Sequence, residues 1–310
     1  MEEALRLKSE LMQDGTLLVP EGFDHPYADP KGDGTGTIIA EFEGTRFRMR
    51  YSPEKGRFAL VERDGGYGLD LDGHPFIGRI GFVKAYCHSP YQANVSLGKF
   101  SSDEEILSYL DKIVATGTVK GIPVSGENPV GEMASIIGKI HSRYPGIPIG
   151  LSYVPVSRSD LLLLKDSGLS EFKIAIGSTI GRIHAALDPE TDVSAALDCL
   201  EEAVGIFGKG KVCTGISVGM GETDQEVEDM FELISGKGIL TDLKLKKIGP
   251  KNRERFESSL GKIPPMTSER LAGLAEMLKS SQERHGLDPS TMDTLCLACR
   301  CCNLVPIRDF

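Results

Sequence analysis

The last residues of the chain concentrate the residue type best suited to bind a soft metal. The sequence ends in LCLACRCCNLVPIRDF, so four of its seven cysteines lie between positions 296 and 302. Cys296, Cys299 and Cys302 form a C-x-x-C-x-x-C pattern, and Cys301 lies inside it. A disulfide is strained at such short spacing, whereas three nearby thiolates can reach adjacent irons of one cubane. The pattern favours an iron–sulfur cluster of the [4Fe-4S] type; zinc, or no metal, is the alternative.

Length, charge and cysteine usage exclude several classes of protein. A chain of 310 residues can bury one large core and a smaller appendage. The formal net charge of -10 and the absence of Trp argue against a nucleic-acid groove. No apolar run approaches the about eighteen residues of a membrane span, and the start MEEALRLKSELMQDG is acidic and helix-like rather than a signal peptide. We therefore expect a cytoplasmic protein with reduced thiols that binds neither membranes nor nucleic acid.

The residue pattern changes character along the chain and predicts three regions. Residues 1–76 are expected to form an N-terminal segment with a small antiparallel β meander at about 35–73, because β-branched and aromatic residues alternate there with charged ones. Residues 77–285 alternate apolar runs with helical stretches and predict a main α/β domain. Residues 286–310 form the cysteine-rich tail.

The main domain is expected to contain six strand–helix units. The first strand lies in RIGFVKAY or in QANVSL, and the others in TVKGIPVS, IPIGLSYV, EFKIAIGS, KVCTGISVG and LTDLKLKKI. Six units are too few for a closed eight-unit barrel and fit a partial parallel (βα)6 TIM-type barrel or a doubly wound sheet. In either fold, ligands bind at the carboxyl ends of the strands.

Two of these predicted strand ends are rich in small residues. Such residues allow the backbone to approach a ligand closely, although each stretch also fits a plain turn between strand and helix. The second stretch is neither a dinucleotide fingerprint nor a phosphate loop, because the required spacing and the Lys-Ser or Lys-Thr pair are absent. The candidate ligand-binding residues are Ser125, Gly126, Glu127, Asn128 and Pro129 in the first stretch, and Gly215, Gly219, Gly221 and Glu222 in the second.

Together these segments resemble the radical S-adenosylmethionine (SAM) superfamily, and its biotin-synthase-related branch in particular. The resemblance covers roughly residues 78–285. It implies that residues 125–129 are a variant of the family's Gly-Gly-Glu-Pro segment, which binds the methionine amino group. It also implies that residues 215–222 lie along the adenine, with Ser217 in place of the family's isoleucine. The implied cofactors are SAM and an iron–sulfur cluster.

The cysteine motif that defines this superfamily is missing. Members carry C-x-x-x-C-x-x-C after the first strand, but aligning Cys87 with the first cysteine places Tyr91 and Asn94 at the other two positions. In the other alignment the cysteine loop is deleted before Ser101. One thiolate cannot hold a cubane. Cys87 is therefore a weaker ligand candidate than the tail cysteines.

Two functions follow from the resemblance, and neither assigns a catalytic residue. The first is a divergent enzyme whose cluster is held by the tail cysteines and which acts in cofactor biosynthesis or sulfur insertion on a small molecule. The second is a non-catalytic relative that binds a nucleoside metabolite or serves as partner subunit of an active member of the superfamily. A fold alone does not decide between them.

Overall fold

The N-terminal strands close into a small β-barrel. The computed structural model describes residues 2–85 and 89–309, so the candidate ligand Cys87 lies outside the described residues. A first helix, α1 (Glu2–Gln13), precedes seven strands whose order in the sheet is β2-β3-β4-β1-β5-β6-β7, with β3 also paired to β7. These strands are β1 (Thr16–Leu18), β2 (Asp29–Pro30), β3 (Gly36–Phe42), β4 (Thr45–Ser52), β5 (Phe58–Arg63), β6 (Gly66–Leu71) and β7 (His74–Val83).

The pairs β3–β4, β5–β6 and β6–β7 are antiparallel, as expected, but the region differs from a simple meander in two respects. First, β1 pairs in parallel with both β4 and β5, and the β3–β7 pair closes the sheet. Second, the region does not end at residue 76, because β7 continues to Val83 within the same sheet. Closure satisfies the backbone groups that two open edge strands would leave exposed. The strand RIGFV therefore belongs to the N-terminal barrel.

The main domain confirms the predicted partial parallel barrel. Its six strands pair in the order β13-β12-β11-β10-β9-β8, and within the described residues β8 and β13 do not pair with each other. The first strand comes from QANVSL, which was one of the two predicted alternatives. The strands are β8 (Val95–Ser96), β9 (Ile122–Ser125), β10 (Ile149–Ser152), β11 (Glu171–Lys173), β12 (Val212–Val218) and β13 (Leu240–Leu245).

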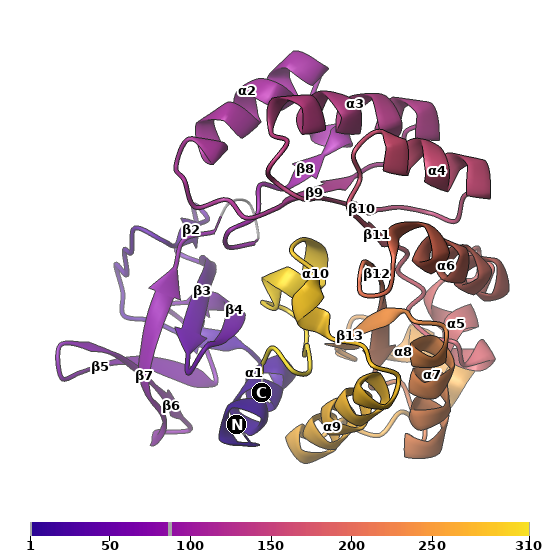
Figure 1. Cartoon of the computed structure of the whole chain (residues 1–310). Helices are drawn as coiled ribbons and strands as arrows, with labels where there is room; N and C mark the ends of the chain where they lie inside the picture. The colour runs from indigo at the N-terminus through magenta and orange to yellow at the C-terminus, as the bar shows by residue number, and fades with distance from the viewer. Residues whose placement is uncertain (1, 86–88, 310) are drawn as a thin grey trace.

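Amphipathic helices connect these strands and cover the outside of the sheet (Figure 1). Ser157 and Thr223 form capping boxes at two of the helix starts, as expected from Ser or Thr followed three residues later by an acid. Within the described parts of the chain, every helix is too short or too polar to span a membrane. The helices are η1 (Leu97–Lys99), α2 (Asp103–Val114), α3 (Val130–Arg143), α4 (Arg158–Asp166), α5 (Gly181–Leu187), α6 (Val193–Phe207), α7 (Asp224–Gly236), α8 (Arg253–Leu260) and α9 (Ser268–Arg284).

The cysteine-rich tail is folded into the barrel. It contains η2 (Pro289–Thr291) and α10 (Leu295–Cys299), and α10 lies between the N-terminal barrel and the parallel sheet (Figure 1). The buried carboxylate of Glu171, at the start of β11, accepts hydrogen bonds from the backbone amides of Asp293 and Thr294 at 2.8 and 2.9 Å. Farther along, Leu304 forms an antiparallel bridge with Leu243 of β13. The tail therefore contacts the open side of the sheet.

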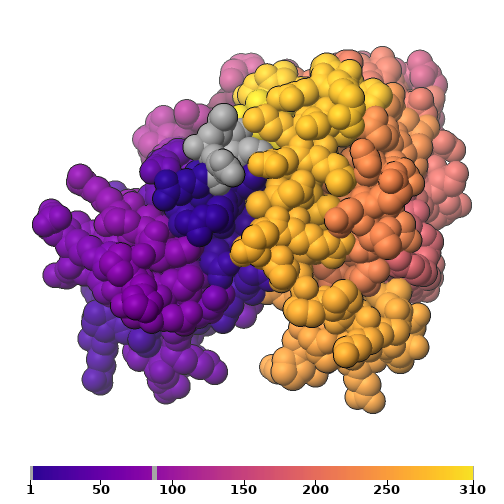
Figure 2. Space-filling view, turned by 90° about the horizontal axis from the view of Figure 1, so that it is seen from below, coloured from indigo at the N-terminus to yellow at the C-terminus, as the bar shows by residue number. Residues whose placement is uncertain are grey.

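A buried ion pair joins the two ends of the chain. The Lys8 side chain in α1 is fully buried. Its ammonium group donates hydrogen bonds to the Asp309 carboxylate at 2.6 Å and to the Arg300 carbonyl at 2.7 Å. The Arg48 amide donates to the Cys301 carbonyl at 2.8 Å. Figure 2 shows the last part of the chain, in orange to yellow, packed between the indigo N-terminal part and the rest of the molecule.

We expect Asp309→Ala to lower the free energy of unfolding by about 3–5 kcal/mol, because it leaves the Lys8 charge buried and uncompensated. Glu202→Ala is the matched control: its carboxylate pairs with exposed Arg158, so the loss should stay below about 1 kcal/mol. Urea denaturation of the full chain measures both. Adding Lys8→Met to Asp309→Ala should recover part of the lost stability, because the buried charge is removed. Equal losses in Asp309→Ala and Glu202→Ala would contradict the stabilising role of the buried ion pair.

Candidate functional site

A cavity of about 380 Å³ lies where the strands of the parallel sheet end. Ser96, Ser125, Ser152 and Lys173 are the last residues of β8 to β11 and stand opposite one another in the strand register. All four line the cavity. Because parallel strands end at the same edge, four residues far apart in sequence form one row there.

The tail cysteines line the same cavity. Cys296, Cys299, Cys301 and Cys302 all border it, together with Leu295 and Asn303. The tail that carries them therefore does reach the carboxyl ends of the barrel strands. Ser125 is thus brought together with the four tail cysteines.

The buried cysteines differ in acidity. The interaction with Cys301 has the largest effect on the Cys299 thiol and lowers its pKa. Burial acts in the opposite direction, but a further hydrogen bond with Ser89 helps to bring the pKa of Cys299 down to about 6. The same interaction and burial raise the pKa of Cys301 well above its usual value. Desolvation and the neighbouring Cys299 also raise the pKa of Cys302, although Cys302 is exposed. Cys299 is therefore the tail thiol whose surroundings most favour the thiolate, and the Cys301 Sγ donates to the Cys299 carbonyl at 3.2 Å.

A second charged group lies behind the thiols, inside the barrel. The ammonium of Lys173 is 2.8 Å from the Asp242 carboxylate, and both side chains are almost fully buried. Burial disfavours the charge on Lys173, but the Asp242 carboxylate outweighs it and raises the pKa of Lys173 well above its ordinary value. Burial likewise opposes ionisation of Asp242, but Lys173 and then Lys244 hold the pKa of Asp242 low.

The glycine at position 215 makes room for this charged group. A Cβ atom on Gly215 would lie 2.8 Å from Asp242 Oδ1, 3.3 Å from Lys244 Nζ and 3.4 Å from Lys173 Nζ. The sequence predicts that Gly215 approaches a bound nucleoside. In the structure it instead underlies the three charged side chains.

Comparison with known proteins relates part of the chain to a known family. The family model described as the radical SAM superfamily matches residues 85–234. This match spans strands β8 to β12 of the parallel barrel. Over 154 residues the chain is 29% identical to the biotin synthase of Magnetococcus marinus, a match that covers 47% of this chain and 46% of the relative. The chain thus spans less than half the length of that relative.

Two solved structures are similar to part of this chain. Methylornithine synthase is 13% identical with a TM-score of 0.45, and the match covers 60% of this chain and 60% of that one. The FeFe-hydrogenase maturase from Carboxydothermus hydrogenoformans is 16% identical with a TM-score of 0.45, and the match covers 63% of this chain and 52% of that one.

The four residues after Ser125 do not line the cavity at the strand ends. Glu127 is exposed, and Asn128 donates from Nδ2 to Glu132 at 3.0 Å while its carbonyl accepts from the Tyr153 hydroxyl. Pro129 caps the start of α3. Gly126 follows Ser125 directly, with Leu97 3.2 Å from the position that a Cβ would take.

The second predicted stretch forms a tight loop after β12. Gly219 and Gly221 have φ angles of +99° and +87°, which favour glycine. The Glu222 carboxylate accepts hydrogen bonds from the amides of Gly219 and Met220 at 2.5 and 2.8 Å. Glu222 therefore holds the loop in shape. The loop is at the same edge of the sheet as Ser125 but does not line the cavity.

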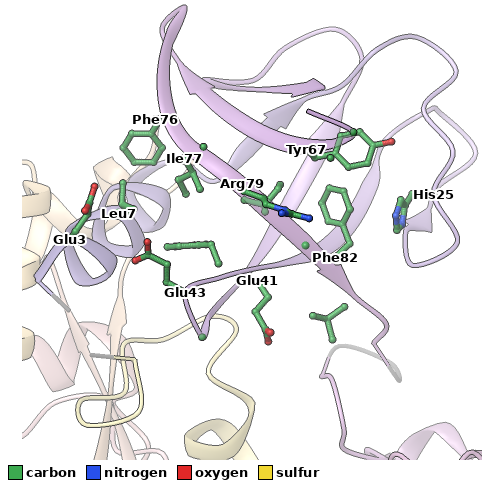
Figure 3. A pocket seen from close by; sticks show the side chains of 18 residues that line it. Glu3, Leu7, His25, Glu41, Glu43, Tyr67, Phe76, Ile77, Arg79 and Phe82 are labelled. Carbon is green, nitrogen blue, oxygen red and sulfur yellow. The ribbon is translucent and has the colours of Figure 1, made fainter. Parts of the chain in front are cut away.

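A second cavity, of about 820 Å³, lies on the N-terminal barrel (Figure 3). Phe76, Ile77, Arg79 and Phe82 of β7 face it, with side chains from α1, β3, β6 and the loop after β1 around them. None of the predicted ligand-binding residues or tail cysteines lines it. The larger hollow is thus separate from the candidate site.

The sequence analysis did not predict the charged and polar residues that lie in or directly behind the cavity. These are Lys173, Asp242 and Lys244 within the parallel barrel, and Gln92 before it. A signal was present, since EFKIAIGS and LTDLKLKKI place charged residues inside otherwise apolar strands. Charged residues are rarely buried without a partner, so such positions indicate paired or functional groups.

We expect Gly215→Ala to lower the free energy of unfolding by about 1–3 kcal/mol, because its methyl group would overlap Asp242. Gly131→Ala is the matched control, since a Cβ at that position in α3 meets nothing within 4 Å. Thermal and urea unfolding of both variants measure the difference. If Gly215→Ala is as stable as Gly131→Ala, the close packing inferred for Gly215 is wrong.

Proposed function

We propose that this chain is an iron–sulfur protein of the radical SAM superfamily whose cluster is held by Cys296, Cys299 and Cys302, and that it acts in cofactor biosynthesis or sulfur-insertion chemistry. One observation carries the proposal. Three thiols spaced C-x-x-C-x-x-C, with Cys301 beside them, line a single cavity at the strand ends of the barrel. Chemistry in parallel barrels takes place at this edge.

The donor set consists of thiols, which suit an iron–sulfur cluster and also zinc. In a cubane each thiolate binds a different iron, so three thiolates spaced C-x-x-C-x-x-C can hold three irons of one cluster.

The chain's own groups have assigned roles in this proposal. A bound cluster would supply an electron or sulfide to the reaction. Cys299 would be one of the cluster ligands, and its lowered pKa would favour the thiolate form that iron binds. Cys301 would stay beside the ligands, with its Sγ donating to the Cys299 carbonyl at 3.2 Å. The apolar residues around the cavity would keep water from the reacting groups.

SAM is the second proposed ligand. We assign its amino acid end to Ser125 and the loop 126–129, and its nucleoside end to the loop that contains Gly219 and Gly221. Both loops follow strands of the same parallel sheet, so they are at one edge of it. Glu222 supports the second loop through its hydrogen bonds to the backbone.

A non-catalytic relative, or a partner subunit of an active member of the superfamily, is the second candidate function. It is favoured by the position of Tyr91, where one alignment places a cluster cysteine of the family. The guanidinium of Arg46 lies 4.9 Å and the ammonium of Lys120 lies 5.5 Å from the centre of the Tyr91 ring. Tyr91 thus has a packing role in place of a metal-binding one.

Anaerobic purification followed by iron and sulfide analysis tests the cluster. We expect the wild type to bind one oxygen-sensitive cluster and the combined variant Cys296→Ala, Cys299→Ala, Cys302→Ala to bind no iron, because its three ligands are removed. Cys199→Ala is the control, since Cys199 bonds the Val156 backbone away from the cavity. Stoichiometric zinc without iron would refute the assignment, and iron retained in the triple variant would move the site elsewhere.

Calorimetric titration of the iron-loaded chain with SAM tests the second ligand. We expect binding, and a weaker affinity in Glu127→Ala, because a polar contact at the mouth is lost. Glu104→Ala, in the first turn of α2, is the exposed acidic control and should bind like the wild type. The absence of measurable SAM binding would leave only the non-catalytic function.

A further inference from the structure

Three lysines line the cavity, and only one of them forms an ion pair within the described residues. Lys99, Lys173 and Lys244 line it, and no Asp or Glu does. Lys173 is neutralised by Asp242 behind it. Lys244 is half-buried, and Lys99 is exposed near the mouth; neither has a hydrogen-bond or ion-pair partner in the described parts of the chain. This is notable in a protein of net charge -10.

An unused hydrogen-bond acceptor lies in the same cavity. Gln92 is only 2% exposed, and its Nε2 donates to the Leu295 carbonyl at 3.0 Å. Its Oε1 is buried and has no partner within residues 2–85 and 89–309. A buried acceptor without a donor costs about 1–3 kcal/mol, so a ligand that supplies an N–H or O–H would be favoured there.

The remaining walls are apolar. Val95, Phe100, Val124, Leu295 and the ring of Tyr109 border the cavity. Its volume of about 380 Å³ matches the lower range of small-molecule sites. A ligand with an apolar body, one anionic end and one donor would satisfy all three features.

We propose that this cavity binds a small organic anion, a carboxylate or a phosphate ester, with Lys244 as its main cationic contact, Lys99 at the entrance and Gln92 accepting from a hydroxyl or amino group. This proposal rests on the proposed function, because the anion would be the substrate of the iron–sulfur protein and would bind beside the cysteines. Its binding is measurable whether or not a cluster is present.

Another role for the lysines makes a different prediction. Lys173 interacts electrostatically with Cys296 and Cys213, and in this other role the lysines only neutralise thiolates. In that case removing Lys244 would lower the iron content and leave the affinity for organic anions unchanged. Iron content and anion binding must therefore be measured on the same preparations.

Calorimetry on the full, anaerobically purified chain tests the proposal with three probes: ω-hydroxyhexanoate, ω-hydroxyhexyl phosphate and the neutral ω-hydroxyhexanamide. We expect at least one anion to bind about tenfold or more tightly than the amide, because a charged hydrogen bond to Lys244 is lost in the amide. The tighter of the two anions identifies the head group. Equal binding of the amide, or no binding of either anion, would overturn the proposal.

Variants of one lysine complete the test. Lys244→Met should weaken anion binding about tenfold or more, and Lys244→Arg should restore most of it. Lys55→Met removes an exposed lysine of the N-terminal barrel that does not line the cavity, and should bind like the wild type. Unchanged binding in Lys244→Met, with or without loss of iron, would refute the assignment. Anion binding by a wild-type chain without iron would support this proposal while refuting the cluster.

Discussion

The buried contact between Lys8 and Asp309 determines where the end of the chain lies. Two charges with almost no exposure to water are stable only if they remain paired, because breaking such a pair costs about 3–5 kcal/mol. The first helix and the last residues are therefore held together, and the segment before Asp309 must run between the N-terminal barrel and the parallel sheet. That path brings the tail cysteines to the strand ends.

The candidate site depends on this path because each side supplies different chemistry. The sheet contributes a row of hydroxyl and ammonium groups at its carboxyl edge, and the tail contributes soft thiols. Enclosure between them removes water, so the Lys173–Asp242 pair and the Cys299–Cys301 hydrogen bond act in surroundings of low dielectric constant. The unequal acidities of the two cysteines follow first from the interaction between them.

Much of the parallel barrel could be predicted from the local residue pattern. Its strands and helices alternate with clear apolar periodicity and clear helix starts, as at Ser157 and Thr223, and the open six-stranded order follows from the number of units. The N-terminal region could not be predicted in the same way. There, β1 pairs in parallel with β4 and β5, and β3 pairs with β7 to close the sheet. No local residue pattern indicates which of these strands pair.

The sequence by itself determined the kinds of residue available: the C-x-x-C-x-x-C thiols, the small residues at two strand ends and the charged residues within apolar strands. Only the tertiary structure decided which of them meet. In the structure, Ser125 lines the same cavity as the tail cysteines, and Gly215 packs closely beneath Asp242. The Glu222 carboxylate accepts hydrogen bonds from backbone amides. The reason is physical: a residue's chemistry is local, but burial, pairing and acidity depend on neighbours that the fold brings from distant parts of the chain.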